Sequence, residues 1–307
     1  MKWISAEELA SLAPYKDIIE ALREAFCIEI ETPVRHYHDT SPVTTLLLMP
    51  AWSKQFTGLK TVTVKTDNAS RGLPTVQGAY LLIDNATGTP VTIMDGTELT
   101  RRRTAAAGAL ASDYLSRKDA STLLLVGAGA LGAHFVRAHA SVRPIKTVLI
   151  YNRTEEKSEA LAAELSAEGF LARAVSDLQN AMAEADIISG ITSSTQAIIK
   201  GAWLKPGTHI DLAGAFKPTM RETDAEAVGR SRVYVDTREG AAAEAGDLIQ
   251  AQAEGQFEFS RVQGDLFELT RGTMMGRKTE SEITLFKSCG TALEDLATAV
   301  MVHLRQS

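Results

Sequence analysis

Apolar residues repeat at helical spacing in the first part of the chain. Ser5 and Glu8 form a capping-box pattern before one helix, and Pro14 begins a second helix with Ile18 and Leu22 on one face. The apolar spacing then changes to that of strands. Four strands are predicted, at residues 44–49, 58–64, 79–84 and 90–94. The first part of the chain is therefore predicted to be a small α+β unit of antiparallel character.

A long Ala-rich helix is predicted at residues 97–115, and after it strands alternate with helices. The predicted strands are 121–126, 147–151, 171–175, 186–191, 208–212 and 233–235, and the helices between them are 129–142, 155–167 and 178–184. A final apolar helix is predicted from about Glu282 through Leu285, Leu293 and Val300. Such alternation predicts an α/β fold, a Rossmann-type doubly wound parallel sheet, beside the smaller α+β lobe. We expect one domain at 1–118, completed by a C-terminal helix at 289–307, and a second at 119–288.

Composition narrows the class of protein. A chain of 307 residues has room for two domains, and its net charge of −6 argues against nucleic-acid or anionic-membrane partners. No apolar run is long enough to cross a membrane, and the acidic start of the chain does not resemble a signal peptide. Cys27 and Cys289 are expected to be reduced thiols in a cytoplasmic protein. His36 and His38 lack a second ligand cluster in the sequence, so no metal site is predicted.

The segment 123–132 is an apolar strand that runs into G-x-G-x-x-G and then into a helix. Gly127 permits the tight turn, Gly129 lets the backbone approach a pyrophosphate, and Gly132 lets the helix pack closely on the strand. The loop, including Ala130 and Leu131, is therefore predicted to bind a dinucleotide at the positive end of the helix. The alternative is a glycine-rich turn that binds no ligand.

The end of the second strand of this domain refines the cofactor. That strand ends in Asn152, Arg153 and Thr154, where an NAD-preferring site usually has an acidic residue for the ribose 2′-hydroxyl. Arg153 could instead pair with a 2′-phosphate, so NADPH is predicted and NADH remains possible. The alternative is that Arg153 is a solvated surface cation.

Five blocks of the sequence, in one order along nearly the whole chain, resemble the ornithine cyclodeaminase/mu-crystallin family. The blocks are 58–62, 72–77, 99–106, the glycine loop, and 286–295. The resemblance implies a homodimer in which the N-terminal lobe binds substrate and forms the dimer interface, and the Rossmann lobe holds the nicotinamide across a cleft. Family members include cyclodeaminases, amino-acid and opine dehydrogenases, and reductases of cyclic ketimines.

The resemblance also implies roles for particular residues. Arg35, Lys60 and Arg103 match the family's carboxylate-binding cations, and Lys60 and Arg103 are expected to be catalytic. Gly290 is expected to allow close approach to the substrate, and Asp295 to orient its neighbours. Four residues are expected to contact the cofactor in addition to the glycine loop and Asn152-Arg153-Thr154: Thr75, Arg103, Thr104 and Thr192.

One departure from the family pattern argues against one of the family's activities, cyclodeamination. The cyclodeaminases carry a catalytic aspartate where this chain has Phe216, which cannot accept a proton or activate water. Phe216 is expected to contact an apolar ring, so the resemblance favours reduction of a small cyclic imino acid. The expected reaction is Δ1-pyrroline-2-carboxylate, or Δ1-piperideine-2-carboxylate, to L-proline or L-pipecolate. An amino-acid or opine dehydrogenase, an ornithine cyclodeaminase and a non-catalytic NADP-binding protein remain as alternatives.

Overall fold

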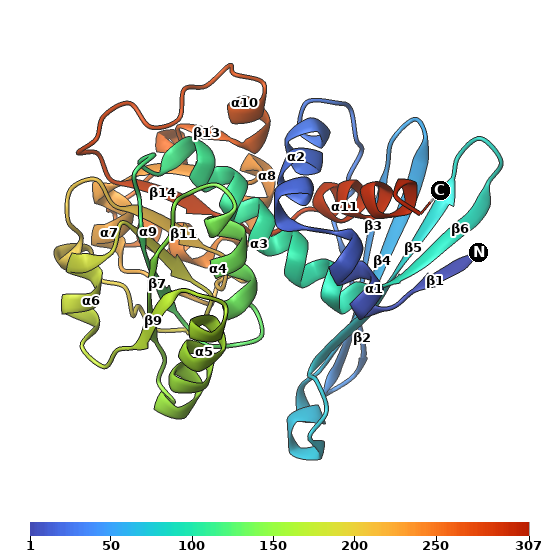
Figure 1. The fold of residues 1–307 in the computed structure, drawn as a ribbon. Coiled ribbons are helices and arrows are strands. Elements are labelled where there is room, and N and C mark those ends of the chain that lie inside the picture. The colour runs from blue at the N-terminus through green and yellow to red at the C-terminus, as the bar shows by residue number, and fades with distance from the viewer. Residues whose placement is uncertain (307) are drawn as a thin grey trace. The chain divides into compact units, whose positions relative to one another are not determined.

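The computed structural model describes residues 1–306, and the chain divides into two compact units (Figure 1). The first unit is Met1–Thr104 together with the chain from Thr291 onward, and the second is Ala105–Gly290. The first boundary falls inside helix α3 (Gly96–Leu115), whereas the sequence led us to expect it at 118. Within the described residues, no helix has both the length and the hydropathy that crossing a bilayer requires.

The first unit contains a six-stranded sheet in the order β1-β6-β5-β4-β3-β2. Its strands are β1 (Lys2–Ile4), β2 (His36–Ser41), β3 (Thr44–Trp52), β4 (Phe56–Lys65), β5 (Val76–Asp84) and β6 (Thr89–Asp95). Neighbouring strands from β2 to β6 are antiparallel, and β1 joins β6 in parallel. The four predicted strands are present as β3 to β6. The two edge strands were not predicted, because β1 is only three residues long and β2 has no alternation of apolar and polar residues.

The helices of the first unit are α1 (Ala6–Leu12), α2 (Tyr15–Ala25), the first half of α3 and α11 (Ala292–Leu304), with a 3-10 helix η1 (Thr66–Arg71) between β4 and β5. The capping box is present, because the Ser5 hydroxyl accepts from the Glu8 amide and the Glu8 carboxylate accepts from the Ser5 amide. Helix α11 packs against α2 and against β3, β4 and β5 (Figure 1). Its first turn therefore brings side chains from the end of the chain to the middle of the sheet.

The second unit contains an eight-stranded, all-parallel sheet in the order β13-β12-β14-β11-β10-β7-β8-β9. Its strands are β7 (Thr122–Val126), β8 (Thr147–Tyr151), β9 (Leu171–Ala174), β10 (Ile187–Gly190), β11 (His209–Leu212), β12 (Arg232–Val235), β13 (Gly264–Asp265) and β14 (Thr284–Lys287). In this order the chain reverses direction across the sheet between β7 and β10. That reversal is the topological switch point, where open α/β sheets bind ligands at the carboxyl ends of their strands.

The helices of the second unit are α4 (Gly132–Ala140), α5 (Glu155–Ala167), α6 (Leu178–Glu184), α7 (Ala225–Arg230), α8 (Arg238–Glu244), α9 (Gly246–Ala253) and α10 (Leu266–Thr270), with 3-10 helices η2 (Gly201–Trp203) and η3 (Phe259–Arg261). The central strands are buried on both faces, as Leu124, Ile188 and Ile210 illustrate with no exposed surface. Continuous apolar strands of this kind are expected when helices cover both faces of a parallel sheet. The predicted Rossmann-type α/β fold is confirmed.

One prediction was wrong. The apolar segment from Glu282 was assigned to a single final helix, but Thr284–Lys287 form strand β14 and the helix begins at Ala292. Strand β14 lies between β11 and β12, and its four residues are buried. A short apolar run fits a buried strand as well as a buried helix, and only its neighbours in the sheet decide between them.

Candidate functional site

The glycine loop lies at the switch point, between the carboxyl ends of β7 and β10. Gly127 has φ of +116°, a conformation that side chains rarely adopt, and a Cβ there would lie 3.1 Å from Thr192 Cγ2. A Cβ at Gly132 would lie 2.6 Å from Leu161 Cδ2, so this glycine lets α4 pack against α5. A Cβ at Gly129 would meet no described atom within 4 Å, because this residue faces open space. The three positions fit the requirements of a dinucleotide-binding turn.

Asn152 connects the end of β8 to the glycine loop. Its Oδ1 atom accepts a hydrogen bond from the Ala128 amide at 3.1 Å, and its Nδ2 atom donates to the Thr154 carbonyl at 2.8 Å. Arg153, between the two, is exposed. The side chain of Asn152 therefore stabilises the loop, and the side chain of Arg153 is accessible to a ligand in solution.

In the first unit, two buried cations and two buried carboxylates form one group, which we call the Lys60 cluster: Lys60, Arg103, Glu294 and Asp295. Lys60 Nζ lies 2.7 Å from Asp295 Oδ2, and Arg103 Nε lies 2.9 Å from Asp295 Oδ1. Arg103 Nη1 lies 2.5 Å from Glu294 Oε2. The cations come from β4 and α3, and the carboxylates from the first turn of α11, where the helix dipole favours negative charge.

Lys60 has an unusual environment for an ammonium group. Burial lowers its pKa to about 8, and the nearby charges of Arg103 and Arg35 act in the same direction. The charge of Asp295 opposes this shift. Arg35, in the segment before β2, therefore contributes to the electrostatics of the Lys60 cluster.

Tyr80 is a buried polar residue that the sequence did not suggest. It is the cross-strand neighbour of Lys60, and its hydroxyl has no hydrogen-bond partner among the described residues. Burial, with a smaller effect of Asp295, raises its pKa well above the usual value. A Cβ at Gly58 would lie 1.8 Å from this hydroxyl, so the glycine makes room for the phenol. In the sequence, Tyr80 is one residue of an ordinary strand pattern, so nothing there indicates that its hydroxyl is buried beside Lys60.

Thr75 and Thr104 of the first unit, which are predicted to contact the cofactor, both form hydrogen bonds with the protein backbone. The Thr75 carbonyl accepts from the Lys65 amide at 2.8 Å. The Thr104 hydroxyl donates to the Thr100 carbonyl at 2.6 Å, within α3. Neither contact assigns a ligand to these residues, and their roles stay predictions.

A second buried charged group, which we call the Glu222 network, lies at the carboxyl ends of the parallel strands. It consists of Glu222, Asp247 and Lys287, all without exposed surface. Glu222 accepts hydrogen bonds from the backbone amides of Thr192 and Gly214, and Lys287 Nζ lies 3.2 Å from Asp247 Oδ2. The sequence offered one signal, because Lys287 is the last residue of an apolar run. If that run is a buried strand, the Lys287 ammonium needs a buried partner.

Asp236 organises the end of β14 in a similar way. Its Oδ2 atom accepts from the amides of Cys289 and Gly290 at 2.7 and 2.6 Å and from the Ser288 hydroxyl at 3.2 Å. Gly290 has φ of +81°, so a glycine suits this turn. Phe216, in the loop after β11, is 42% exposed and available to a ligand.

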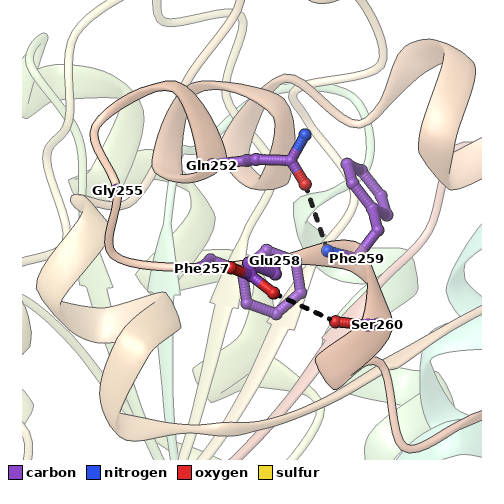
Figure 2. Close-up of a pocket in the computed structure, with 6 residues that line it drawn as sticks. All are labelled: Gln252, Gly255, Phe257, Glu258, Phe259 and Ser260. Atoms are coloured by element: carbon purple, nitrogen blue, oxygen red, sulfur yellow. Dashed lines mark hydrogen bonds between the residues drawn. The ribbon is translucent and has the colours of Figure 1, made fainter.

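A surface hollow of about 500 Å³ lies elsewhere in the second unit, beside the end of α9 (Figure 2). Its lining comes from the segment 252–260, where the rings of Phe257 and Phe259 meet edge to face. The Gln252 side chain accepts from the Phe259 amide (Figure 2). None of the predicted site residues lines this hollow.

Comparison with known proteins places this geometry in a family. The family model described as "Ornithine cyclodeaminase/mu-crystallin family" matches residues 4–307. A Delta(1)-pyrroline-2-carboxylate reductase of Paracoccus denitrificans is 38% identical over 97% of this chain and 95% of its own length. The structure of Thermococcus litoralis Delta(1)-pyrroline-2-carboxylate reductase in complex with NADH and L-proline superposes with a TM-score of 0.94 at 32% identity, over 99% of this chain and 97% of that one. An archaeal alanine dehydrogenase dimer with bound NAD gives 0.92 at 30% identity, over 99% and 95%.

The fold and the glycine loop define a Rossmann-type dinucleotide-binding protein of the kind found in nicotinamide-dependent dehydrogenases. The chain belongs to the ornithine cyclodeaminase/mu-crystallin family. The resemblance stated from the sequence is therefore confirmed.

Proposed function

We propose that this protein is an oxidoreductase that reduces a cyclic imino acid, with Δ1-pyrroline-2-carboxylate as its main substrate and L-proline as the product. Δ1-Piperideine-2-carboxylate, one ring carbon larger, is the second substrate of the same reaction. The observation that carries the proposal is the Lys60 cluster, in which buried cations lie beside a carboxylate pair in a chain similar to pyrroline-2-carboxylate reductases along nearly its whole length.

In the proposed reaction, Lys60, Arg103 and Arg35 bind the substrate carboxylate. A guanidinium can hold a carboxylate with two parallel hydrogen bonds, which fixes the plane of the attached ring. Asp295 holds both Lys60 and Arg103, so the two cations are already oriented before the substrate arrives. A carboxylate held in this way also fixes the C=N bond of the ring. The reaction is then faster, because the imine carbon is already oriented toward the hydride donor.

The glycine loop is proposed to hold the dinucleotide, which supplies the hydride for the imine carbon when it is bound. The imine nitrogen takes its proton from solution, so the product has one new C–H and one new N–H bond. We propose NADPH as the preferred cofactor, because Arg153 is exposed beside the loop and no carboxylate occupies 152–154. The similar solved structures carry NADH or NAD, so the preference for the 2′-phosphate is a proposal about this chain.

Phe216 supports reduction over cyclodeamination. It stands where the resemblance places the catalytic aspartate of cyclodeaminases, and its exposed ring offers an apolar contact to a pyrroline or piperideine.

We also propose that the protein is a cytoplasmic homodimer. The edge strand β2 and the segment before it expose Val34 and Tyr37, and the similar archaeal alanine dehydrogenase is a dimer. Light scattering of the purified protein would test the dimer.

The function is tested by following the absorbance of NADPH with Δ1-pyrroline-2-carboxylate and Δ1-piperideine-2-carboxylate, with NADH in parallel. We expect turnover with both imino acids without added amine, and a higher kcat/KM with NADPH. No oxidation of either cofactor above background would contradict the proposal. Turnover of pyruvate that requires ammonia would indicate an alanine dehydrogenase, which the second structural match makes the specific alternative.

A further inference from the structure

A single carboxylate holds two loops at the carboxyl end of the parallel sheet. Oε1 of Glu222 accepts a hydrogen bond from the Thr192 amide at 2.6 Å, and Oε2 accepts from the Gly214 amide at 2.7 Å. Thr192 lies in the loop after β10, and Gly214 lies in the loop after β11, two residues before Phe216. The two loops that carry a proposed cofactor residue and a proposed substrate residue therefore share one acceptor group.

Two glycines lie against this carboxylate, and neither position has room for a side chain. A Cβ at Gly214 would lie 2.1 Å from the Thr192 carbonyl oxygen and 2.5 Å from Glu222 Oε1. A Cβ at Gly190 would lie 3.1 Å from the carboxyl carbon of Glu222. Glycines at both positions let the loops approach the carboxylate from two sides, so its position and theirs depend on each other.

The rest of the Glu222 network keeps the carboxylate in place. Oδ1 of Asp247, in α9, accepts from the backbone amides of Glu222 and Thr223 at 2.7 and 2.9 Å. Lys287, at the end of β14, pairs with the other oxygen of Asp247. The network thus connects the ends of three adjacent strands, β10, β11 and β14, without contact with solvent.

We propose that Glu222 is a positioning residue, whose ionised carboxylate sets the loops 191–194 and 213–216 in the conformation that binds dinucleotide and substrate. Its effect on turnover rests on the proposed function. Its effect on dinucleotide binding does not, since Thr192 lies next to Gly127 of the glycine loop.

The charge of Glu222 changes in the neutral pH range. Burial raises its pKa to about 7; the charge of Lys287 opposes this shift and that of Asp247 adds to it. Protonation removes the negative charge shared by the two accepting oxygens and turns one of them into a hydroxyl group. Both loop amides therefore lose a charge-assisted hydrogen bond, and one of them is left with the weaker acceptor. Dinucleotide binding should therefore weaken as the pH falls below about 7.

The test uses Glu222→Gln, which keeps the shape of the side chain and presents an NH2 group to one of the two amides. Asp186→Asn is the matched control. Asp186 also accepts from two backbone amides, of Ser121 and Thr122 at 3.0 and 3.1 Å, but at the amino end of the same sheet. The probe is NADH, which lacks the 2′-phosphate that would itself titrate near pH 6. Binding is measured by NADH fluorescence between pH 6 and 8.5, with circular dichroism as the check of folding.

At pH 8 we expect Glu222→Gln to raise the Kd for NADH about tenfold and Asp186→Asn to leave it unchanged. The wild-type Kd should rise as the pH falls through 7, and Glu222→Gln should abolish this dependence. A folded Glu222→Gln protein with the Kd and pH profile of the wild type would overturn the inference. If the variant does not fold, a wild-type Kd that is constant from pH 6 to 8.5 would overturn it as well.

Turnover separates this inference from the proposed function. In an active enzyme, kcat/KM with Δ1-pyrroline-2-carboxylate should show a limb that rises through pH 7 in the wild type and in Asp186→Asn, and that is absent in Glu222→Gln. A wild-type protein that binds NADH with the expected pH dependence but reduces no imino acid would contradict the proposed function and leave Glu222 as a positioning residue for the dinucleotide.

Discussion

Lys60 Nζ and Asp295 Oδ2 lie 2.7 Å apart, in a region where both side chains are buried, although the residues are far apart in sequence. Each compensates for the cost of burying the other, because a lone buried charge is strongly disfavoured. The same aspartate holds Arg103, so the orientation of two proposed carboxylate-binding groups depends on one residue of α11.

Asp295→Asn should therefore destabilise the protein and disturb ligand binding together. Loss of one partner leaves a buried charge without compensation, at a cost of about 3 kcal/mol in the free energy of unfolding. Chemical denaturation measures this cost. Glu20→Gln, which removes the exposed pair with Arg23, is the control and should cost less than about 1 kcal/mol. Equal losses in the two variants would show that Asp295 is not the compensating charge.

The pKa of Lys60 gives a pH dependence with a defined sign. Because burial lowers this pKa to about 8, the ammonium that we propose to bind the substrate carboxylate is lost as the pH rises through 8. The Kd for L-proline, measured by calorimetry on the enzyme saturated with oxidised cofactor, should rise above that pH. Lys60→Gln should bind L-proline about tenfold more weakly at pH 7 and show no such rise. A rise that persists in Lys60→Gln would assign the titration to another group.

Arg153→Ala tests the proposed preference for NADPH. A charge-assisted hydrogen bond contributes about 1.5–3 kcal/mol, so the Kd for NADPH should increase about 10- to 100-fold. The Kd for NADH should change little, because NADH has no 2′-phosphate. Fluorescence titration with each cofactor measures both values. Equal losses for NADPH and NADH would argue that Arg153 acts on the fold of the loop and does not bind the 2′-phosphate.

Two alanine variants separate the roles of the loop glycines. Gly127→Ala forces a side chain into a φ of +116° and should cost about 1–3 kcal/mol of stability as well as dinucleotide binding. Gly129→Ala adds a methyl group in open space, so stability should change by less than about 0.5 kcal/mol while binding weakens. Thermal unfolding and NADPH titration check both. A Gly129→Ala protein that binds NADPH as tightly as the wild type would remove this residue from the proposed site.

Ionisation of Glu222 should lower the stability of the fold, although we propose that it strengthens dinucleotide binding. Its folded-state pKa of about 7 exceeds the ordinary value of 4.5, so its contribution to stability is fully present below pH 4.5 and is lost as the pH rises through 7. The difference in unfolding free energy between the wild type and Glu222→Gln should fall by about 3 kcal/mol across this range and stay constant above it. Denaturation at several pH values measures the difference. A difference that does not vary with pH would show that Glu222 has an ordinary pKa.

The elements that the sequence predicts correctly carry local signals. The capping box of Ser5 and Glu8, the strands β3 to β6 and the strand–loop–helix around Gly127 were predicted, because periodicity, caps and glycines act within about ten residues. Strand β14 was assigned wrongly, because four apolar residues have no period of their own and became a strand through their neighbours β11 and β12.

By itself the sequence determined the strands β3 to β6, the Rossmann-type alternation of strands and helices from β7 onward and the residues of the glycine loop, all of which depend on short-range stereochemistry and on local periodicity. Only the tertiary structure decided which charges share a partner: Lys60 and Arg103 with Asp295, and Lys287 with Asp247. The physical reason is that the cost of burying a charge depends on which partner lies within hydrogen-bonding distance of it. Here those partners come from strands and helices that meet only when the chain folds.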